Sequence, residues 1–334
     1  MPLPKKVLLD TDPGVDDAMA LAFLHRHAAV QLLGITTVFG NAEVEVTTRN
    51  ALYLAERFGI AAPLARGAAR PLARPPRGAA AQVHGDDGLG NLEGPIAPAR
   101  QPDPRPAHRL IIDTLRAHPG EVTLVAVGPL TNLALALSLE PALPQLVREV
   151  VVMGGAFGTH GHGGNVSPVA EANVLCDPHA ADAVFTAPWP VTIVGLDVTH
   201  EVLMDAAAFE RLRAEGGDEG AFLFEASRHY VDFYRRALGV AGCFVHDASA
   251  VAYLLAPELF TTRRGPLRVV CEGIALGQTI QNAGARRWSH GEAWAGLPAQ
   301  QVCTAVQADA VLELFLGTLR RSRGGGCHFT AAVD

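Results

Sequence analysis

The chain has 334 residues, of which 49% are hydrophobic and 18% are charged, and its formal net charge is −7. This composition is that of an ordinary globular protein and excludes the disordered, collagenous and fibrous classes. An acidic chain without a sustained run of lysine and arginine also lacks the charge pattern of nucleic-acid-binding proteins, so we expect no nucleic-acid partner. We expect a single domain over residues 1–334, because α/β domains of this length often form one unit.

Two apolar stretches are candidates for a signal peptide or a membrane-spanning helix, and neither has the required length and composition. Only three apolar residues, Val7–Leu9, follow the first lysines before Asp10, which is too short for the core of a signal peptide. The run Val122–Leu139 is interrupted by Gly, Pro, Thr and Asn and predicts a strand, a turn and a helix. The five cysteines are scattered and form no Cys-x-x-Cys pair, which favours a reducing compartment. We therefore expect a cytoplasmic protein without membrane spans.

Short apolar runs alternate with helical stretches from the amino terminus onward. The pairs of predicted strand and helix are Lys6–Leu9 with Asp16–His27, Leu32–Val38 with Glu43–Phe58, and Val122–Ala126 with Leu130–Leu139. Two further predicted strands, Glu149–Met153 and Val191–Val194, each lead into a loop that contains glycine. This alternation predicts an α/β, Rossmann-like fold with an open, mostly parallel central sheet flanked by helices. Ligands of such sheets bind beyond the carboxyl ends of the strands.

Three later segments have distinct compositions. Two stretches rich in Ala, Pro and Arg, Ala61–Ala81 and Gly94–Ala107, are expected to be mostly solvated loops. Between them, Val83–Asn91 crowds a histidine, two aspartates and three glycines together, which suggests the rim of a site. A helix is predicted over Gly220–Leu238, and a spacing of four residues places Tyr230 and Tyr234 on one of its faces.

An acidic cluster follows the first predicted strand. Asp10, Asp12, Asp16 and Asp17 place four carboxylates within eight residues, where they repel one another unless a cation offsets their charge. Oxygen-only ligands suit Ca²⁺ or Mg²⁺, and the lack of nearby Cys and His argues against zinc. Helix capping could account for one aspartate but not for four. An aspartyl nucleophile of a haloacid-dehalogenase-like phosphatase is an alternative interpretation, which the Pro13-Gly14 that follows weakens.

Several segments in a fixed order resemble those of the inosine/uridine-preferring nucleoside hydrolases. The matches extend over about residues 6–255, the resembling core over about 6–315, and residues 316–334 carry no expectation. The segments are Asp10–Leu21, Val38–Asn41, Val83–Gly90, Val127–Asn132, Val152–Ala156, Gly164–Asn165, Ala170–Asn173, Asp177–Pro178 and Val245–Asp247. Together they form a specific pattern, although each alone would be a weaker signal.

The resemblance implies one Ca²⁺ ion per subunit at the bottom of a pocket. The ligands in this chain would be Asp12, Asp17, the backbone carbonyl of Val127, and Asp247, and the ribose 2′ and 3′ hydroxyls would complete the coordination. Asp12 would also be the general base for the attacking water, while Asn41 would orient the sugar and the catalytic centre. Asp10 would support the loop without touching the ion.

The resemblance also implies the residues that contact the substrate. Asp16 and Asn173 would hold the ribose diol, and Asn165 and Glu171 the 5′ and 3′ side. The remaining expected pocket residues are Met153, His84, Tyr230 and Tyr234. For His84 a role in ordering the loop is nearly as well supported, and for the two tyrosines ordinary core packing is nearly as well supported.

Cleavage of an N-glycosidic bond builds positive charge on the sugar ring, which surrounding carboxylates favour. The departing base needs a proton, and His246, with an ordinary pKa of ~6.5, could be charged at working pH and donate it. A loop-ordering histidine is the alternative. The tract His160-Gly161-His162 resembles a metal-binding sequence, but we interpret it as solvated.

One departure from the family pattern concerns the pocket, where Ala172 replaces the usual aromatic residue. The pocket could be wider or filled from another loop. The leading hypothesis is a Ca²⁺-dependent ribonucleoside N-ribohydrolase of nucleoside salvage, with a homodimer or homotetramer as the expected assembly. The rival hypotheses are the phosphatase and a nucleoside- or ribose-binding protein that has lost catalysis. The sequence leaves the preference between purines and pyrimidines open.

Overall fold

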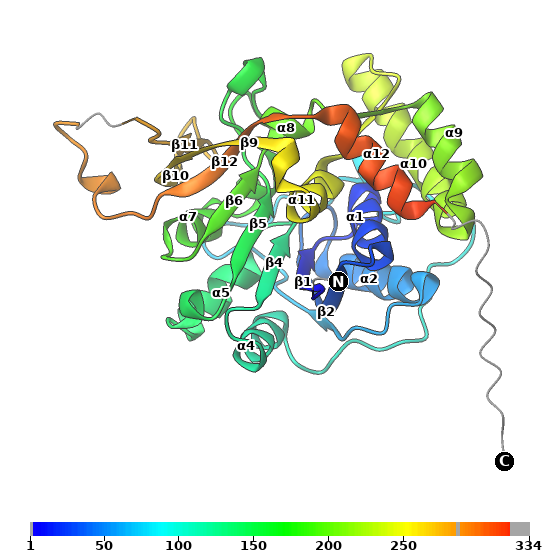
Figure 1. The fold of residues 1–334 in the computed structure, drawn as a ribbon, viewed down its shortest axis with the longest axis horizontal. Helices are drawn as coiled ribbons and strands as arrows, with labels where there is room; N and C mark the ends of the chain where they lie inside the picture. Colours follow the sequence, from blue (N-terminus) through cyan, green and yellow to red (C-terminus); the bar gives the residue numbers. More distant parts are fainter. Residues whose placement is uncertain (1–2, 285–287, 321–334) are drawn as a thin grey trace.

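A computed structural model describes residues 3–284 and 288–320 of the chain. Within them, the centre is an eight-stranded sheet in the order β3-β2-β1-β4-β5-β6-β12-β9, which is parallel except for β9 at one edge (Figure 1). Its strands are β1 Lys5–Thr11, β2 Val30–Thr37, β3 Leu64–Arg66, β4 Val122–Ala126, β5 Glu149–Met153, β6 Val191–Val194, β9 Phe260–Gly265 and β12 Gln300–Val306. Two antiparallel pairs lie outside this sheet: β7 Leu203–Asp205 with β8 Gly242–Phe244, and β10 Leu267–Val269 with β11 Thr279–Gln281. The predicted open, mostly parallel sheet is confirmed.

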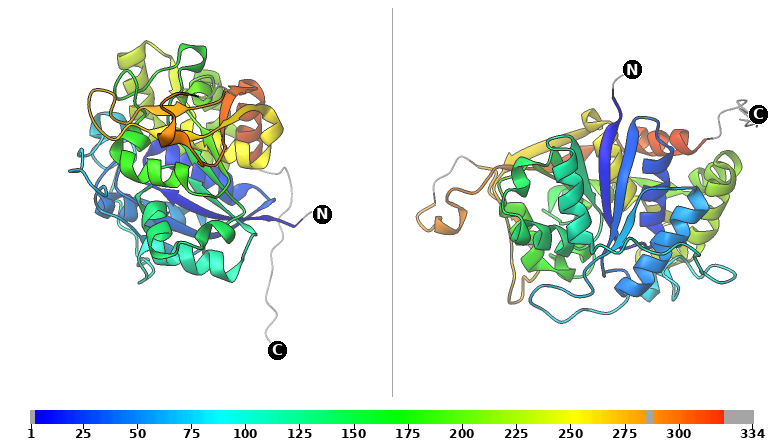
Figure 2. Two further views of the ribbon diagram at one scale, coloured as in Figure 1. Left: turned by 90° about the vertical axis from the view of Figure 1, so that its left-hand side faces the viewer. Right: turned by 90° about the horizontal axis from the view of Figure 1, so that it is seen from below.

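Helices cover both faces of the sheet (Figure 2). The helices that contribute to the core on one face are α1 Val15–Arg26, α2 Val44–Phe58, α9 Ala206–Glu215, α10 Gly217–Leu238, α11 His246–Leu255 and α12 Ala308–Leu319. Those on the other face are α4 Ala107–Ala117, α5 Thr131–Leu139 and α7 Pro178–Thr186. Three short helices complete the set: α3 Ala81–His84, α6 Ala172–Cys176 and α8 Leu196–Thr199. None of the helices in the described part is both long and apolar enough to cross a membrane.

Strand β1 explains why the strands appear as continuous apolar runs in the sequence. Val7 and Leu9 belong to the core on one face of the sheet, and Leu8 belongs to the core on the other. A strand that is buried on both faces needs apolar residues at every position. The structure extends β1 beyond the predicted Leu9 to Asp10 and Thr11, which are also buried. These polar residues therefore lie in the strand and lead directly into the acidic cluster.

The helix ends follow recognisable local rules. Helices α2 and α10 end at Gly59 and Gly239, which adopt left-handed conformations with φ of 71° and 70°. Glycine accepts this conformation without the steric cost of a β-carbon. Helix α1 begins directly after Gly14 and carries Asp16 and Asp17 in its first turn, where the partial positive charge of the helix terminus favours acidic side chains.

The structure corrects the interpretation of Ala61–Ala81 as a loop in one part. Leu64–Arg66 forms strand β3, which pairs in parallel with β2 and buries Leu64 and Ala65. Three residues inside a stretch rich in Ala, Pro and Arg are too short to give a detectable alternating pattern. Most of the sequence tail 316–334 and Cys327 lie outside the described residues, which end at Arg320.

Candidate active site

The loop after β1 holds the Asp17 carboxylate in a dense set of hydrogen bonds. Its Oδ1 accepts from the hydroxyl of Thr11 and from the backbone N–H of Asp12 at 3.2 Å. Its Oδ2 accepts from the backbone N–H of Gly14 at 2.9 Å and from Asn41 Nδ2 at 3.0 Å. Four donors on one buried carboxylate fix its orientation. The same loop is thereby folded around the first turn of α1.

A second strand-end loop positions Asp12. The backbone N–H of Asn41, which follows β2, donates to Asp12 Oδ2 at 2.7 Å, and Asn41 Nδ2 donates to the Asp12 carbonyl at 3.2 Å. Asp12 Oδ1 is buried and has no hydrogen-bond partner among the described residues. One oxygen of Asp12 is therefore fixed, and the other is free to bind a ligand.

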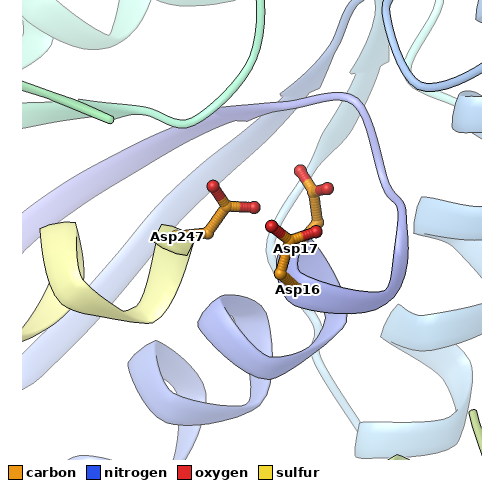
Figure 3. A group of neighbouring side chains, drawn as sticks. All are labelled: Asp16, Asp17 and Asp247. Atoms are coloured by element: carbon orange, nitrogen blue, oxygen red, sulfur yellow. The ribbon is translucent and has the colours of Figure 1, made fainter. Parts of the chain in front are cut away.

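Asp247 comes from a distant part of the sequence and lies close to the acidic loop. It lies in the first turn of α11, and carboxylate oxygens of Asp16, Asp17 and Asp247 lie within 4.8 Å of one another. Figure 3 shows the Asp247 carboxylate facing the two carboxylates of α1. Asp16 Oδ1 is buried and, within the described part of the chain, unpartnered. Three buried carboxylates at this spacing form an acidic cluster that could hold a metal ion.

Burial and mutual repulsion raise the pKa values of these carboxyl groups. Desolvation raises the pKa of Asp16 to about 6, and desolvation followed by the charge of Asp16 raises that of Asp17 to about 6. Desolvation and then neighbouring carboxylates hold the pKa values of Asp12 and Asp247 well above their usual range. The cluster cannot carry its full negative charge at neutral pH without a positive partner.

Asp10 lies behind the cluster and supports it. Its Oδ1 accepts from Thr36 Oγ1 at 2.5 Å and from Asn132 Nδ2 at 2.7 Å. Asn132 also donates to the carbonyl of Thr37 at 2.9 Å and so links β1, β2 and α5. Desolvation raises the pKa of Asp10 to about 7. Asn132 was not predicted as an individual site residue, although it is the last residue of the segment Val127–Asn132 that contributed to the resemblance.

The wall opposite the cluster is built from the ends of β4 and β5 and from α6. Asn173 Nδ2 donates to the carbonyl of Val127 at 2.8 Å and to that of Met153 at 3.3 Å. Glu171 caps α6 and accepts the backbone N–H groups of Gly155, Asn173 and Val174 at 2.8–3.0 Å. These bonds occupy both oxygens of Glu171. Its side chain therefore stabilises the backbone of this wall. Asn165 is exposed, and its Oδ1 accepts from the backbone of Ala172 at 3.0 Å.

A chain of hydrogen bonds runs from Asp16 to His246 along α10. The hydroxyl of Tyr230 donates to Asp16 Oδ2 at 3.1 Å and lies 3.3 Å from that of Tyr234. The hydroxyl of Tyr234 lies 2.8 Å from His246 Nε2, and His246 Nδ1 lies 2.7 Å from Thr199 Oγ1. Both tyrosines are buried, as ordinary core packing predicts. Their hydroxyl groups also connect them by hydrogen bonds to Asp16 of the acidic site.

The structure corrects the expected charge of His246. Burial, and then the neighbouring His200 and His84, hold its pKa well below the usual range, so the imidazole is neutral at working pH. His200 is a pocket residue that sequence analysis missed, and its ring centroid lies 5.3 Å from that of His246. The pKa depends on groups from separate elements, which the sequence alone does not bring together.

His84 forms the rim of the site together with Tyr230. The two rings are stacked with centroids 5.4 Å apart, and His84 Nδ1 accepts the backbone N–H of Val15 at 3.2 Å. Burial lowers the pKa of His84 to about 4, which keeps Nδ1 available as an acceptor. The predicted rim of the site at Val83–Asn91 thus does contact the acidic loop.

These walls enclose a cavity of about 330 Å³. The sequence-predicted residues that line it are Asp16, Asn41, His84, Val127, Met153, Asn165, Glu171, Asn173, Tyr230, Tyr234, His246 and Asp247. Ala172 also lines it, and Phe233 of α10 supplies an aromatic ring to the same cavity. The tract at His160 and His162 is only partly solvated, since His160 is exposed while His162 pairs with Glu201 beside His200.

The fold and the site define an α/β protein with a buried, acidic ligand pocket at the carboxyl edge of a parallel sheet. The sequence model of the family described as "Inosine-uridine preferring nucleoside hydrolase" matches residues 7–313. The chain belongs to this family and is a ribonucleoside hydrolase. Membership excludes the phosphatase alternative.

Known proteins with related sequences agree with this assignment. The chain is 39% identical over 308 residues to probable uridine nucleosidase 1 of Oryza sativa subsp. japonica, covering 92% of this chain and 94% of the relative. It is 42% identical over 281 residues to the inosine-uridine preferring nucleoside hydrolase of Leishmania major, covering 83% of this chain and 88% of the relative. The solved structure of the plant nucleoside hydrolase PpNRh1 superimposes with a TM-score of 0.91 at 35% identity, covering 96% of this chain and all (100%) of that chain.

Proposed function

We propose that this chain hydrolyses the N-glycosidic bond of ribonucleosides to ribose and free base, with Ca²⁺ as its cofactor. The observation that carries the proposal is the buried cluster of Asp16, Asp17 and Asp247, of which Asp16 and Asp247 line the cavity. Asp12 and Asp16 each have a buried oxygen without a hydrogen-bond partner among residues 3–284 and 288–320. These oxygens fit a hard cation, which would offset their desolvation. The residues proposed to hold the ion are Asp12, Asp17, the carbonyl of Val127, and Asp247.

A bound Ca²⁺ would neutralise the carboxylates and supply a coordination site for a water and the ribose diol. Asp12, with one oxygen fixed by Asn41 and the other free, is the proposed general base that takes the proton of the attacking water. Asp16 and Asn173 are proposed to bind the ribose hydroxyls, with Asn165 and Glu171 toward the 5′ and 3′ side. The surrounding carboxylates favour the positive charge that develops on the sugar ring.

The departing base is proposed to lie between α10 and α11. Tyr230, Tyr234 and His246 line this part of the cavity. A neutral imidazole can donate a hydrogen bond but not its proton, because it would become an imidazolate. We therefore propose that His246 is protonated in the substrate complex, where the imidazolium would give its proton to the base and return to the neutral form. His84 and Met153 are proposed to contact the sugar.

The assay that tests the proposal is release of reducing sugar from inosine and uridine, with calcium and with a chelator. These substrates are chosen because the relative from Leishmania major is named as preferring inosine and uridine, and that from Oryza sativa as a uridine nucleosidase. We expect turnover with calcium, loss of turnover with chelator, and abolished turnover after Asp12→Ala. Binding of nucleoside and calcium in calorimetry without sugar release would instead support the rival binding protein.

We further propose a homodimer or homotetramer acting in nucleoside salvage in the cytoplasm. Cys176, Cys243, Cys271 and Cys303, the cysteines within the described ranges, are unpaired, which suits a reducing compartment. Sedimentation velocity of the purified protein tests the assembly, and a monomer at micromolar concentration would contradict it.

A further inference from the structure

Asn50 links two loops of the site from behind, without touching the cavity. It lies on α2 with a fully buried side chain. Its Nδ2 donates one hydrogen bond to the carbonyl of Pro13 at 3.2 Å and another to the carbonyl of Asp87 at 3.0 Å. Pro13 belongs to the acidic loop, and Asp87 belongs to the loop that follows His84. A single amide group thus bridges two segments that are far apart in the sequence.

The orientation of this amide group is fixed by Arg49. Arg49 Nε and Nη2 donate to Asn50 Oδ1 at 3.2 Å and 2.9 Å. Arg49 Nη2 also donates to the Asp87 carbonyl at 2.7 Å. The oxygen of Asn50 therefore faces a cation, and its nitrogen faces two carbonyls. Rotating the amide by half a turn would place an oxygen against two carbonyl oxygens, which is unfavourable.

The loop held by Asn50 transmits its position to His84. The Asp87 carboxylate accepts three backbone N–H groups at 2.7–2.8 Å, those of Leu89, Asn91 and Leu92. The backbone N–H of Gly90 donates to the His84 carbonyl at 2.7 Å. Because these bonds close the loop into a compact turn, the place of the Asp87 carbonyl determines the place of His84.

The fit between His84 and the acidic loop leaves little room for movement. His84 Nδ1 accepts the Val15 N–H, and a β-carbon added at Gly14 would lie only 2.5 Å from the same nitrogen. On the other side of the turn, a β-carbon added at Gly88 would lie 2.7 Å from Asn50 Nδ2. The two loops approach as closely as their glycines allow. A tether between them is therefore needed to hold this register.

We propose that Asn50 is a positioning residue for nucleoside hydrolysis, whose amide ties the acidic loop to the His84 loop and so places His84 at the cavity. The inference rests on the proposed function of the site, because His84 matters to turnover only if the cavity binds a nucleoside. Asn50 does not touch the substrate. Its effect passes through His84.

The test variant is Asn50→Asp, which keeps the size of the side chain and its partner Arg49 but removes both donated hydrogen bonds. We expect kcat/KM for the better of inosine and uridine to fall about tenfold, mostly through a higher KM, because the proposed contact of His84 with the sugar would form on binding and persist during bond cleavage. Thr48→Val is the matched control. Thr48 is buried on the same helix and bonds to Thr37, away from both loops, so its loss should leave kcat/KM within twofold.

A double-mutant cycle separates positioning from general destabilisation. In a His84→Ala background, Asn50→Asp should lower kcat/KM less than twofold, because the residue through which it acts is gone. An equal tenfold loss in both backgrounds would overturn the proposal. If Asn50→Asp does not fold, Asn50→Ala serves in the same cycle, since it removes the two donors without introducing a buried charge.

A measurement that needs no turnover distinguishes failure of this inference from failure of the proposed function. Hydrogen exchange followed by mass spectrometry should show faster exchange in peptides covering 84–92 and the Val15 amide in Asn50→Asp, but not in Thr48→Val. Unchanged exchange would refute the tether even if the wild-type enzyme is active. If the wild-type protein cleaves no nucleoside, the proposed function fails, and the exchange data alone decide whether Asn50 holds the two loops together.

Discussion

The buried charge of Asp247 lowers the stability of the calcium-free protein, whereas the same carboxylate is a proposed ligand of the metal ion. It is buried, and desolvation and then the charges of Asp16, Asp17 and Asp12 raise its pKa. Asp247→Asn removes this charge while preserving the shape of the side chain. We expect calcium affinity and kcat/KM to fall about 100-fold, because a proposed ligand is lost. We also expect the calcium-free protein at pH 8 to gain at least about 1 kcal/mol in free energy of unfolding.

Calorimetric titration with Ca²⁺ and urea unfolding in the presence of chelator measure these two effects. The variant Asp86→Asn, at an exposed position of the His84 loop, is the control and should change neither quantity. A calcium affinity equal to that of the wild type would remove Asp247 from the proposed ligand set.

His246 gives a second prediction at the scale of one residue. If it supplies the proton of the departing base, His246→Ala should lower kcat on inosine about 100-fold or more. The same variant should lose much less activity on a nitrophenyl riboside, because nitrophenolate leaves without needing a proton. Comparison of kcat on the two substrates provides the measurement. An equal loss on both would indicate that His246 orders the loop instead of donating a proton.

Most of the predicted pocket residues do line the cavity, because they lie in short segments with fixed spacing, whereas His200 and Phe233 lie outside those segments and were missed. The hydrogen-bond partners and protonation states of these residues could not be predicted from the sequence. Asp17 accepts four hydrogen bonds from Thr11, Asp12, Gly14 and Asn41, and His246 lies among other histidines. These surroundings depend on the distances between elements, which no local pattern encodes. For the same reason the sequence pointed to Asn41 but not to Asn50 or Thr199.

At the scale of secondary-structure elements, the end of β4 must pass very close to the acidic loop. A β-carbon added at Gly128 would lie 2.5 Å from Asp12 Oδ1, the oxygen for which the described part of the chain supplies no hydrogen-bond partner. We expect Gly128→Ala to displace the Asp12 carboxylate and to lower kcat/KM about 100-fold, measured by sugar release. The same change at Gly317 in α12, where nothing lies within 4 Å, is the control and should retain full activity. A Gly128→Ala variant with the kcat/KM of the wild type would show that turnover does not depend on this position of the Asp12 carboxylate.

The elements themselves were predicted to different degrees. Strands β4, β5 and β6 match their predicted bounds because each is a continuous apolar run between turn residues. Strand β3 was missed because it is short, and the order of strands was not predictable because pairing depends on contacts between distant segments. For example, β12 lies between β6 and β9, and nothing in the sequence of these three strands indicates which of them pair.

The whole molecule should respond to pH through its buried acids. Burial raises the pKa of Asp10 to about 7 and those of Asp16 and Asp17 to about 6. At these carboxyl groups the folded protein binds protons more tightly than the unfolded chain, so their contribution to stability falls as the pH rises through 7. The buried His84 and His246 have lowered pKa values and act in the opposite direction below about pH 6.5. Above that pH only the acids matter, and we expect the calcium-free protein to lose on the order of 2 kcal/mol in free energy of unfolding between pH 6.5 and pH 8.

Thermal unfolding with chelator and with calcium at several pH values provides the measurement. Calcium should raise Tm more at pH 8 than at pH 5, because protons compete with the cation for the same oxygens. A calcium-free protein that is more stable at pH 8 than at pH 6.5 would contradict the electrostatic account of the cluster.

The acidic cluster joins the first turn of α1 to the first turn of α11, which lie more than two hundred residues apart in the sequence. During synthesis the loop after β1 leaves the ribosome long before Asp247 is made. A nascent or truncated chain that stops before α11 has an incomplete set of oxygens and could not form the proposed cation site. The proposed calcium binding would therefore need the chain through α11, and catalytic competence would arise only after that helix has been made.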